Sequence, residues 1–330
     1  GGNLSEHMLR ILVALQKVSK KGSVVVSGSA DFLSFRAAWR MLQRDGWVRE
    51  EALTSDSLDL ALPVIAAIKK HGRKVRLVHV TAVSSVYQYA FTQHELVAIV
   101  DAANSVGAVV LIDVCQSFCN IEYDFDKITK GSKDVFILGS CVKHARSLEG
   151  VGWCAFNPES SLRENLPSGW CADLSMLNYP MHDPDFKEMR TRLDGGTVAN
   201  AVHAEFFVEQ QQYLLQNGLS TRVVNDRVWR LQNLFMSQLG VDADGQADFC
   251  RVEGWCRRQA YPEARSKVLV LDCHAGPVAA GDLTSQLRDL GFRVDSRHDR
   301  FLRIGFDLCH TEANVIGLAD AISSLVQRED

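Results

Sequence analysis

Short apolar runs alternate along this chain with stretches in which apolar residues recur every three or four positions. Apolar runs of this length are typical of buried strands, and the three-to-four spacing is typical of amphipathic helices. In the first half, the spacing predicts helices at 6–19, 33–44 and 92–105 and strands at 23–27, 75–80, 108–113, 134–139 and 151–156. Strands that alternate with helices predict an α/β fold, with a mostly parallel central sheet flanked by helices.

The pattern changes in the second half of the chain. A loop-rich stretch runs from Pro158 to Gly196, and stretches of this length without regular elements are usually functional. Beyond it the pattern predicts helices within 200–238 and at 281–290 and 311–328, and strands at 266–273, 291–295 and 301–306. We therefore expect a large domain at residues 1–205 and a smaller C-terminal α+β domain at 206–330.

Composition narrows the class of protein. Of the 330 residues, 46% are hydrophobic and 23% are charged, which suits a large buried core. The net charge is -4 and the two signs are interspersed, so neither nucleic acid nor an anionic membrane is an expected partner. The nine cysteines form no CxxC pair and mostly lie in apolar runs, which indicates a reducing cytoplasm and no metal site. No apolar run approaches the ~20 residues of a membrane span, and no secretory signal is seen.

Two polar residues at strand ends are the candidates for chemistry. Asp113 closes the apolar strand 108–113, and Lys143 follows the next strand, 134–139. Open α/β sheets bind their ligands at the carboxyl ends of the strands. Each residue also has an ordinary explanation, because a strand-end aspartate can cap the following turn and a lysine can extend its amine to solvent.

Taken together, the two residues suit pyridoxal 5′-phosphate (PLP). This cofactor needs a carboxylate that keeps its ring nitrogen protonated and an amine that forms a Schiff base with its aldehyde. A lysine that follows a buried strand, amid apolar and small residues, is expected to have a desolvated amine that loses its proton near neutral pH. We therefore predict that Lys143 holds PLP and that Asp113 pairs with its ring nitrogen.

Two longer segments, 79–117 (HVTAVSSVYQYAFTQHELVAIVDAANSVGAVVLIDVCQS) and 134–153 (DVFILGSCVKHARSLEGVGW), resemble fold-type I PLP enzymes of the class V aminotransferase group. Three shorter motifs narrow the resemblance to kynureninase: Ser168-Gly169-Trp170, Gly196-Thr197 and the FLRIGF strand at 301–306. The resemblance implies the PLP-dependent transferase fold of type I and extends over the whole chain. An N-terminal segment found in relatives is expected to be missing, since the chain opens at Gly1 without Met.

The resemblance also implies roles for individual residues. Phe32 matches the aromatic residue that stacks on the cofactor ring, although it could be an ordinary core phenylalanine. The phosphate is expected to bind at the N-terminus of the first helix, where backbone N–H groups and the helix dipole favour an anion. The residues that match its other contacts are Asn3, Leu4, Ser140, Trp170 and Thr197.

Two further expectations concern the substrate and the assembly. Arg303 matches the residue that binds the substrate α-carboxylate in two hydrogen bonds, and its ordinary explanation is a surface ion pair. Thr197 matches a residue that reaches the phosphate of the neighbouring subunit, which implies a homodimer with shared active sites.

Three positions depart from the kynureninase pattern. Gln116 stands where kynureninases have histidine, and glutamine is what cysteine desulfurases carry there, as a cofactor-binding residue that hydrogen-bonds the phenolic oxygen. Val142 replaces a tyrosine that binds the phosphate and takes part in proton transfer, and Thr81 replaces an asparagine. These changes leave cofactor binding intact and make the hydrolytic step the open question.

Three functions therefore remain as hypotheses. The first is a kynureninase-like hydrolase that converts L-kynurenine or 3-hydroxykynurenine to an anthranilate and L-alanine, with Lys143 as the base at the substrate Cα. The second is a class V aminotransferase, carbon–sulfur lyase or cysteine desulfurase, the last of which would need a nucleophilic cysteine that the sequence does not assign. The third is a non-catalytic homologue.

Overall fold

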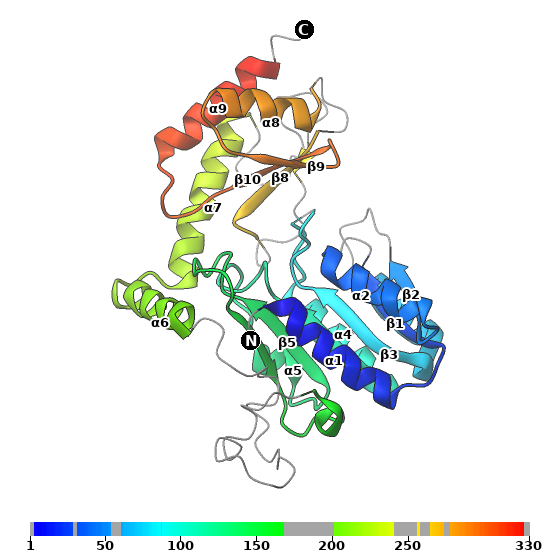
Figure 1. The fold of residues 1–330 in the computed structure, drawn as a ribbon. Helices are drawn as coiled ribbons and strands as arrows, with labels where there is room; N and C mark the ends of the chain where they lie inside the picture. The colour runs from blue at the N-terminus through cyan, green and yellow to red at the C-terminus, as the bar shows by residue number, and fades with distance from the viewer. Residues whose placement is uncertain are drawn as a thin grey trace. The chain divides into compact units, whose positions relative to one another are not determined.

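The computed structural model describes residues 3–28, 32–53, 61–86, 88–167, 201–240, 256–257, 265–273 and 278–326 (Figure 1). The chain divides into two compact units. The large unit comprises Gly1–Val83 and Phe91–Tyr213, and the small unit comprises Ser84–Ala90 and Leu214–Asp330.

A mostly parallel sheet forms the centre of the large unit. Its described strands are β1 (Ser23–Gly28), β2 (Val48–Leu53), β3 (Val75–Thr81), β4 (Val109–Asp113), β5 (Val135–Ser140) and β6 (Gly152–Phe156), in the order β2-β1-β3-β4-β5-β6. Strands β1 to β5 pair in parallel, and β6 runs antiparallel to β5. The predicted α/β class is therefore confirmed.

Helices cover both faces of this sheet. Helices α1 (Leu4–Val18) and α2 (Leu33–Arg44) pack on one face, where Met8, Phe35 and Trp39 meet the strand residues Leu77 and Leu111 in one core. The opposite face is covered by α3 (Ala61–His71) and α4 (Gln93–Val106), which pack against each other (Figure 1). A capping box of Thr92 and Glu95 begins α4, and Gly107, with φ +72°, ends it. Between these elements lie three short helices, η1 (Gly72–Lys74), α5 (Phe125–Thr129) and η2 (Arg163–Asn165).

The small unit is an antiparallel sheet with helices packed on it. Its described strands, in the order β7-β8-β10-β9, are β7 (Cys256–Arg257), β8 (Val268–Asp272), β10 (Phe301–Gly305) and β9 (Asp295–Arg297). The helices are α7 (Thr221–Gln238), α8 (Ala280–Asp289) and α9 (Glu312–Val326). Buried residues of the helices and the sheet, among them Phe235, Leu271 and Leu302, form a core within this unit. Helix α6 (Ala201–Gln216) precedes α7, and most of its residues belong to the large unit.

Most predicted elements are present, with shifts of one or two residues at their ends. The strand predicted at 291–295 is wrong, because the strand of this region is β9, which begins only at Asp295. Strand β2 and helix α3 were not predicted. None of the described helices combines the length and the apolar character that a membrane crossing requires.

Candidate cofactor site

The carboxyl ends of β4 and β5 bring two of the predicted residues to one edge of the sheet. Asp113 is the last residue of β4 and pairs with Leu138, while Ser140 is the last residue of the neighbouring β5. The Asp113 side chain is buried, with 3% of the residue exposed. One of its oxygens accepts a hydrogen bond of 2.8 Å from the Cys115 backbone N–H. Asp113 thus caps its turn, as the ordinary explanation expects, and places a buried carboxylate at the strand end.

Lys143 lies in the connection between β5 and β6, which backbone hydrogen bonds hold in a defined shape. The Lys143 carbonyl accepts from Arg146 N at 2.9 Å, and Cys141 pairs with both Ser147 and Val151. The Lys143 side chain is exposed. The expected desolvation of its amine is therefore wrong for this chain, because the connection extends beyond the buried sheet and the apolar residues do not cover it.

Phe32 lies close to the Lys143 amine. Its ring centroid is 5.9 Å from the Lys143 Nζ atom, although the two residues lie far apart in the sequence of the large unit. Phe32 directly precedes α2, and 50% of the residue is exposed. An ordinary core phenylalanine is therefore excluded, since a core residue of this size would be fully covered. The exposed ring beside an amine is available to stack on a flat ligand.

Cys115 joins this group, although the sequence did not single it out. Burial, as the larger cause, and the neighbouring Asp113 carboxylate together raise the pKa of its thiol to about 11. The Lys143 ammonium and a hydrogen bond from Ser140 act in the opposite direction. Asp113, Ser140 and Lys143 are therefore all close enough to Cys115 to act on the pKa of its thiol. Only the pairing of β4 with β5 brings Cys115 and Ser140 together, so no local sequence signal could have found it.

The N-terminus of α1 reaches the same edge of the sheet. Asn3 is its N-cap, and the Asn3 side chain accepts a hydrogen bond of 2.9 Å from Glu6 N. The helix start touches Gly152, where an added Cβ would lie 2.6 Å from the Asn3 carbonyl carbon and 2.9 Å from Leu4 N. Gly152 is in turn the Cα partner of Ser140. The first N–H groups of α1, which have no partner within the helix, are therefore positioned beside Ser140.

Helix α6 holds the connection that carries Lys143. Gln211 donates a hydrogen bond of 3.0 Å to the Ala145 carbonyl, and His203 donates from Nδ1 to the Glu149 carbonyl. Between them along the helix, Phe207 packs against Phe118 with ring centroids 6.1 Å apart. The spacing of four residues puts these three side chains on one face of α6. The sequence could have revealed that these residues share one helix face, but nothing in it indicated that this face contacts the Lys143 segment.

The remaining predicted residues divide into three groups. Gln116 and Thr81 are buried, and Val142 is 37% exposed. The Gln116 backbone carbonyl accepts a hydrogen bond of 2.7 Å from the Asn120 side chain. The motifs Ser168-Gly169-Trp170 and Gly196-Thr197 lie outside the described residues. Arg303 belongs to the small unit.

Arg303 has partners within its own unit. It lies on β10 and donates a hydrogen bond of 2.8 Å from Nη1 to the Ser85 carbonyl. Its Nε atom is 3.4 Å from an Asp295 carboxylate oxygen. Burial lowers the pKa of the guanidinium, and the Asp295 charge partly offsets this effect. The alternative ion pair is therefore present, and its aspartate is 45% exposed.

The described residues fit PLP in charge and shape. The buried Asp113 carboxylate suits a protonated ring nitrogen, the half-exposed Phe32 ring suits a stacked pyridine, and the helix start at Leu4 suits a phosphate. Lys143 supplies an accessible amine beside that ring. Among the described residues no cluster of side chains has the composition of a metal site.

Known proteins provide an independent comparison. A family model described as "Aminotransferase class-V" matches residues 5–201. The apo cysteine desulfurase of Thermococcus onnurineus NA1 is similar in structure, with a TM-score of 0.75 and 17% identity, over 99% of this chain and 78% of that one. The cysteine desulfurase CsdA of Escherichia coli gives 0.74 and 17%, over 99% and 78%. The cystine C-S lyase C-DES gives 0.73 and 13%, over 98% and 80%. No curated protein sequence matches the chain.

Proposed function

Because the chain belongs to the class V aminotransferase family, whose cofactor is PLP, we propose that it is an enzyme that acts on a small amino acid. The observation that supports this proposal best is the group at the carboxyl ends of β4 and β5. There the Lys143 amine lies 5.9 Å from the centroid of the exposed Phe32 ring. The charges of both Lys143 and Asp113 also act on the pKa of the Cys115 thiol. An amine, a carboxylate and an aromatic ring are what this cofactor requires from a protein.

Each residue of the group has a proposed role. Lys143 would hold the cofactor covalently and then take the proton from the substrate Cα atom. Asp113 would keep the ring nitrogen protonated, so that PLP, when bound, accepts electron density from the substrate carbon. Phe32 would stack on the ring, and Gln116 would hydrogen-bond the phenolic oxygen.

The phosphate and the substrate carboxylate need separate partners. We assign the phosphate to the start of α1 at Asn3 and Leu4, with Ser140 adding a hydroxyl. Trp170 and Thr197 remain proposed phosphate ligands on their sequence match. Arg303 remains the proposed partner of the substrate α-carboxylate, which would compete with the partly exposed Asp295 for its guanidinium.

The first reaction to consider is kynureninase-like hydrolysis of L-kynurenine or 3-hydroxykynurenine to an anthranilate and L-alanine. Its support is the sequence likeness at 168–170, 196–197 and 301–306. In this reaction the chain's residues would orient the amino acid, move the Cα proton through Lys143 and admit water to the side-chain carbonyl.

The second reaction is cleavage at a carbon–sulfur bond, and the Gln116 and Val142 positions favour it. Three of the described cysteines of the large unit limit this alternative. Burial raises the pKa of Cys115 and Cys141 to about 11 and that of Cys154 to about 12, so none of these three thiols is ionised near neutral pH. They therefore favour a lyase, which needs no protein thiolate, over a desulfurase that uses one of them.

Product analysis separates these reactions. The PLP-loaded protein would be incubated with L-kynurenine, 3-hydroxykynurenine, L-cysteine and L-cystine, each with and without an α-keto acid. Alanine and an anthranilate without a keto acid would establish hydrolysis. Sulfur release with pyruvate and ammonia would establish the lyase, whereas sulfur release with alanine would establish the desulfurase. Dependence on a keto acid would establish transamination. Lys143→Ala should abolish every one of these activities, whereas Lys133→Ala, at an exposed lysine of the same unit, should not. A protein that binds PLP and converts no substrate would be the non-catalytic homologue.

We also propose a homodimer. Several apolar side chains of α6 are exposed: Val202 at 76%, Phe206 at 44% and Tyr213 at 65%. None of the residues of α6 is buried. A second copy of the chain would cover these side chains, as the match of Thr197 to a residue shared between subunits suggests.

The proposed compartment is a reducing cytoplasm. Cys115, Cys119, Cys141, Cys154, Cys273 and Cys309 are free thiols, and all of these except Cys309 are at least partly buried. Free, buried cysteines are typical of proteins from such a compartment.

A further inference from the structure

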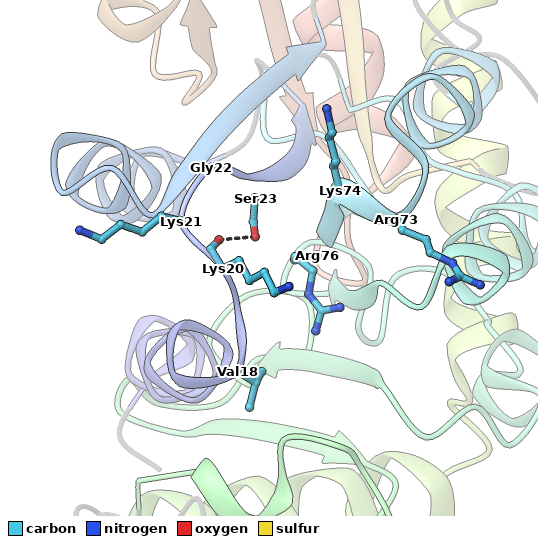
Figure 2. Close-up of a pocket in the computed structure, with 8 residues that line it drawn as sticks. All are labelled: Val18, Lys20, Lys21, Gly22, Ser23, Arg73, Lys74 and Arg76. Carbon is cyan, nitrogen blue, oxygen red and sulfur yellow. Dashed lines mark hydrogen bonds between the residues drawn. The ribbon is translucent and has the colours of Figure 1, made fainter.

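A pocket lies at the edge of the large-unit sheet opposite the Lys143 site (Figure 2). Two chain segments line it, the turn at 18–23 that leads into β1 and the segment 73–76 that leads into β3. Strands β1 and β3 are parallel neighbours, so both segments lie at amino ends of the sheet, whereas Asp113 and Lys143 follow carboxyl ends. The pocket has a volume of about 440 Å³, within the range of small-molecule sites.

The lining of this pocket is strongly basic. Five of the eight residues are cationic and none is acidic; the cations are Lys20, Lys21, Arg73, Lys74 and Arg76. Within the described part of the chain none of the five forms an ion pair. The Nε atom of Arg76 is buried and has no hydrogen-bond partner. A buried charged donor without a partner is unfavourable, so this arrangement favours an anion from outside the chain.

Two of the cations are placed to share one ligand. In Figure 2 the side chains of Lys20 and Arg76 extend toward the same space, whereas Arg73 extends away from it. Lys21 instead lies over the Trp47 ring, 5.7 Å from its centroid. The Lys20 backbone is fixed, since its carbonyl accepts from Ser23 N at 3.2 Å and from Ser23 Oγ at 2.6 Å. The cationic turn is thus preorganised.

We propose that this pocket binds a small molecule that carries a diphosphate or triphosphate group. The guanidinium of Arg76 can bind phosphate oxygens in pairs, and the Lys20 ammonium adds a point charge. Several neighbouring cations without counter-ions match the several negative charges of such a group better than one carboxylate. A long nucleic acid is disfavoured, because two basic residues outside the pocket, Arg49 and Lys70, are paired with Glu51.

Calorimetric titration of the PLP-loaded full chain with sodium tripolyphosphate, at constant ionic strength, tests this proposal. We expect one saturable site per chain, with sulfate and inorganic phosphate binding at least about tenfold more weakly. The double variant Lys20→Gln, Arg76→Gln should weaken tripolyphosphate binding about tenfold or more. The matched control Arg230→Gln, Arg288→Gln removes two exposed arginines elsewhere and should bind as the unaltered protein does.

Further measurements separate this pocket from the cofactor site and from a folding defect. Lys143→Ala should bind tripolyphosphate normally, and the double variant should retain the absorbance of bound PLP. If the double variant does not fold, Lys20→Gln alone, at an exposed side chain, should still weaken binding. The proposal is overturned if tripolyphosphate binds no tighter than sulfate, if the variants at Lys20 bind it unchanged, or if Lys143→Ala loses it. Binding of RNA or an acidic peptide without tripolyphosphate binding would overturn it as well.

Discussion

The protonation of Cys115 depends on its neighbours at the ends of β4 and β5. Burial is the main reason for its high pKa, and two charges of opposite sign act on it, the Asp113 carboxylate and the Lys143 ammonium. Removing either charge therefore changes the thiol in a direction that can be stated in advance. The thiol also serves as a reporter, because its ionisation responds to the two residues that are proposed to hold the cofactor.

We expect Cys115 to resist alkylation in the cofactor-free protein. With a pKa of about 11, only about a thousandth of the thiol is ionised at about pH 8. Iodoacetamide labelling followed by peptide mass spectrometry should show Cys115 reacting far more slowly than the exposed Cys309. Asp113→Asn should accelerate the labelling of Cys115 and Lys143→Ala should slow it further. Equal rates in all three proteins would contradict the proximity of these groups.

His7 should make stability depend on pH. It is buried against β6, where its Nε2 atom lies 3.2 Å from the Gly152 carbonyl, and burial is the largest cause that lowers its pKa. In the unfolded chain this histidine has a pKa of about 6.5 and takes up a proton as the pH falls below that value. Because the folded protein takes up the proton only at lower pH, protonation favours the unfolded state. The contribution of neutral His7 to the free energy of unfolding is thus fully present above about pH 6.5 and is lost as the pH falls below that value.

Urea unfolding between about pH 8 and 5 measures this effect. The denaturation midpoint should fall toward the acidic end, and His7→Gln should make the midpoint less dependent on pH over that interval. The carboxylates with lowered pKa values, such as Glu51 and Asp124, titrate at more acidic pH and do not account for it. An identical pH profile in His7→Gln would show that this histidine is not responsible.

At the residue scale, the sequence indicated which residues are candidates for chemistry better than it indicated their burial and their partners. Asp113 and Lys143 were accessible to prediction, because a carboxylate and an amine at successive strand ends have a chemical meaning. The exposure of Lys143 was not, since it depends on how far the connection to β6 extends beyond the sheet. The Asp295 partner of Arg303 also depends on the pairing of β9 with β10, which the mistaken strand position concealed.

The contact between α1 and β6 is the element-scale feature on which phosphate binding would depend. Gly152→Ala would place a methyl group 2.6 Å from the Asn3 carbonyl carbon and 2.9 Å from Leu4 N. Backbone atoms cannot rotate away as a flexible side chain can, so the start of α1 must shift. We expect a loss of about 1–3 kcal/mol in stability, typical of overpacking.

The same variant should weaken PLP binding about tenfold, because the N–H groups at Leu4 would no longer face the phosphate. Thermal unfolding and titration with PLP measure the two effects. Gly305→Ala provides the control, since a Cβ at this strand position meets no atom within 4 Å and Gly305 has no positive φ. If Gly152→Ala binds PLP as tightly as the unaltered protein, the start of α1 does not hold the phosphate.

The predicted elements were those in which one signal dominated. Apolar runs identified β1, β3, β4 and β5, since parallel strands are buried on both faces. Strand β2 was missed because it is an edge strand with the charged sequence VREEAL, and one of its glutamates accepts a hydrogen bond from Ser27 of β1. Helix α3 was obscured by Pro63, which lies in its first turn, where proline is tolerated.

For the whole molecule, alternating strands and helices were sufficient to predict the α/β class. The basic pocket was beyond prediction, because its cations come from segments 20–21 and 73–76 and only the pairing of β1 with β3 gathers them. In the linear sequence the segment 69–76 is rich in cations and has no acidic residue, but nothing there shows that it lies beside Lys20 and Lys21.

The exposed apolar side chains of α6 are proposed to form the interface of a homodimer. We expect light scattering after size exclusion to give the mass of a dimer for the unaltered protein. Val202→Glu with Tyr213→Glu should shift the mass toward the monomer, because two charges would stand among the apolar side chains of the proposed interface. Leu290→Glu, at a 56% exposed leucine of the small unit, should remain dimeric. A monomeric unaltered protein would contradict the proposed homodimer.

The central claim is that Lys143 holds PLP, and reduction with borohydride tests it most directly. The protein would be reconstituted with PLP, reduced, digested and examined by peptide mass spectrometry. The reduction makes a Schiff base permanent, so the account predicts the cofactor adduct on the peptide that contains Lys143, and its loss in Lys143→Ala but not in Lys133→Ala. An adduct on another lysine, or unmodified Lys143 after saturation with PLP, would contradict it.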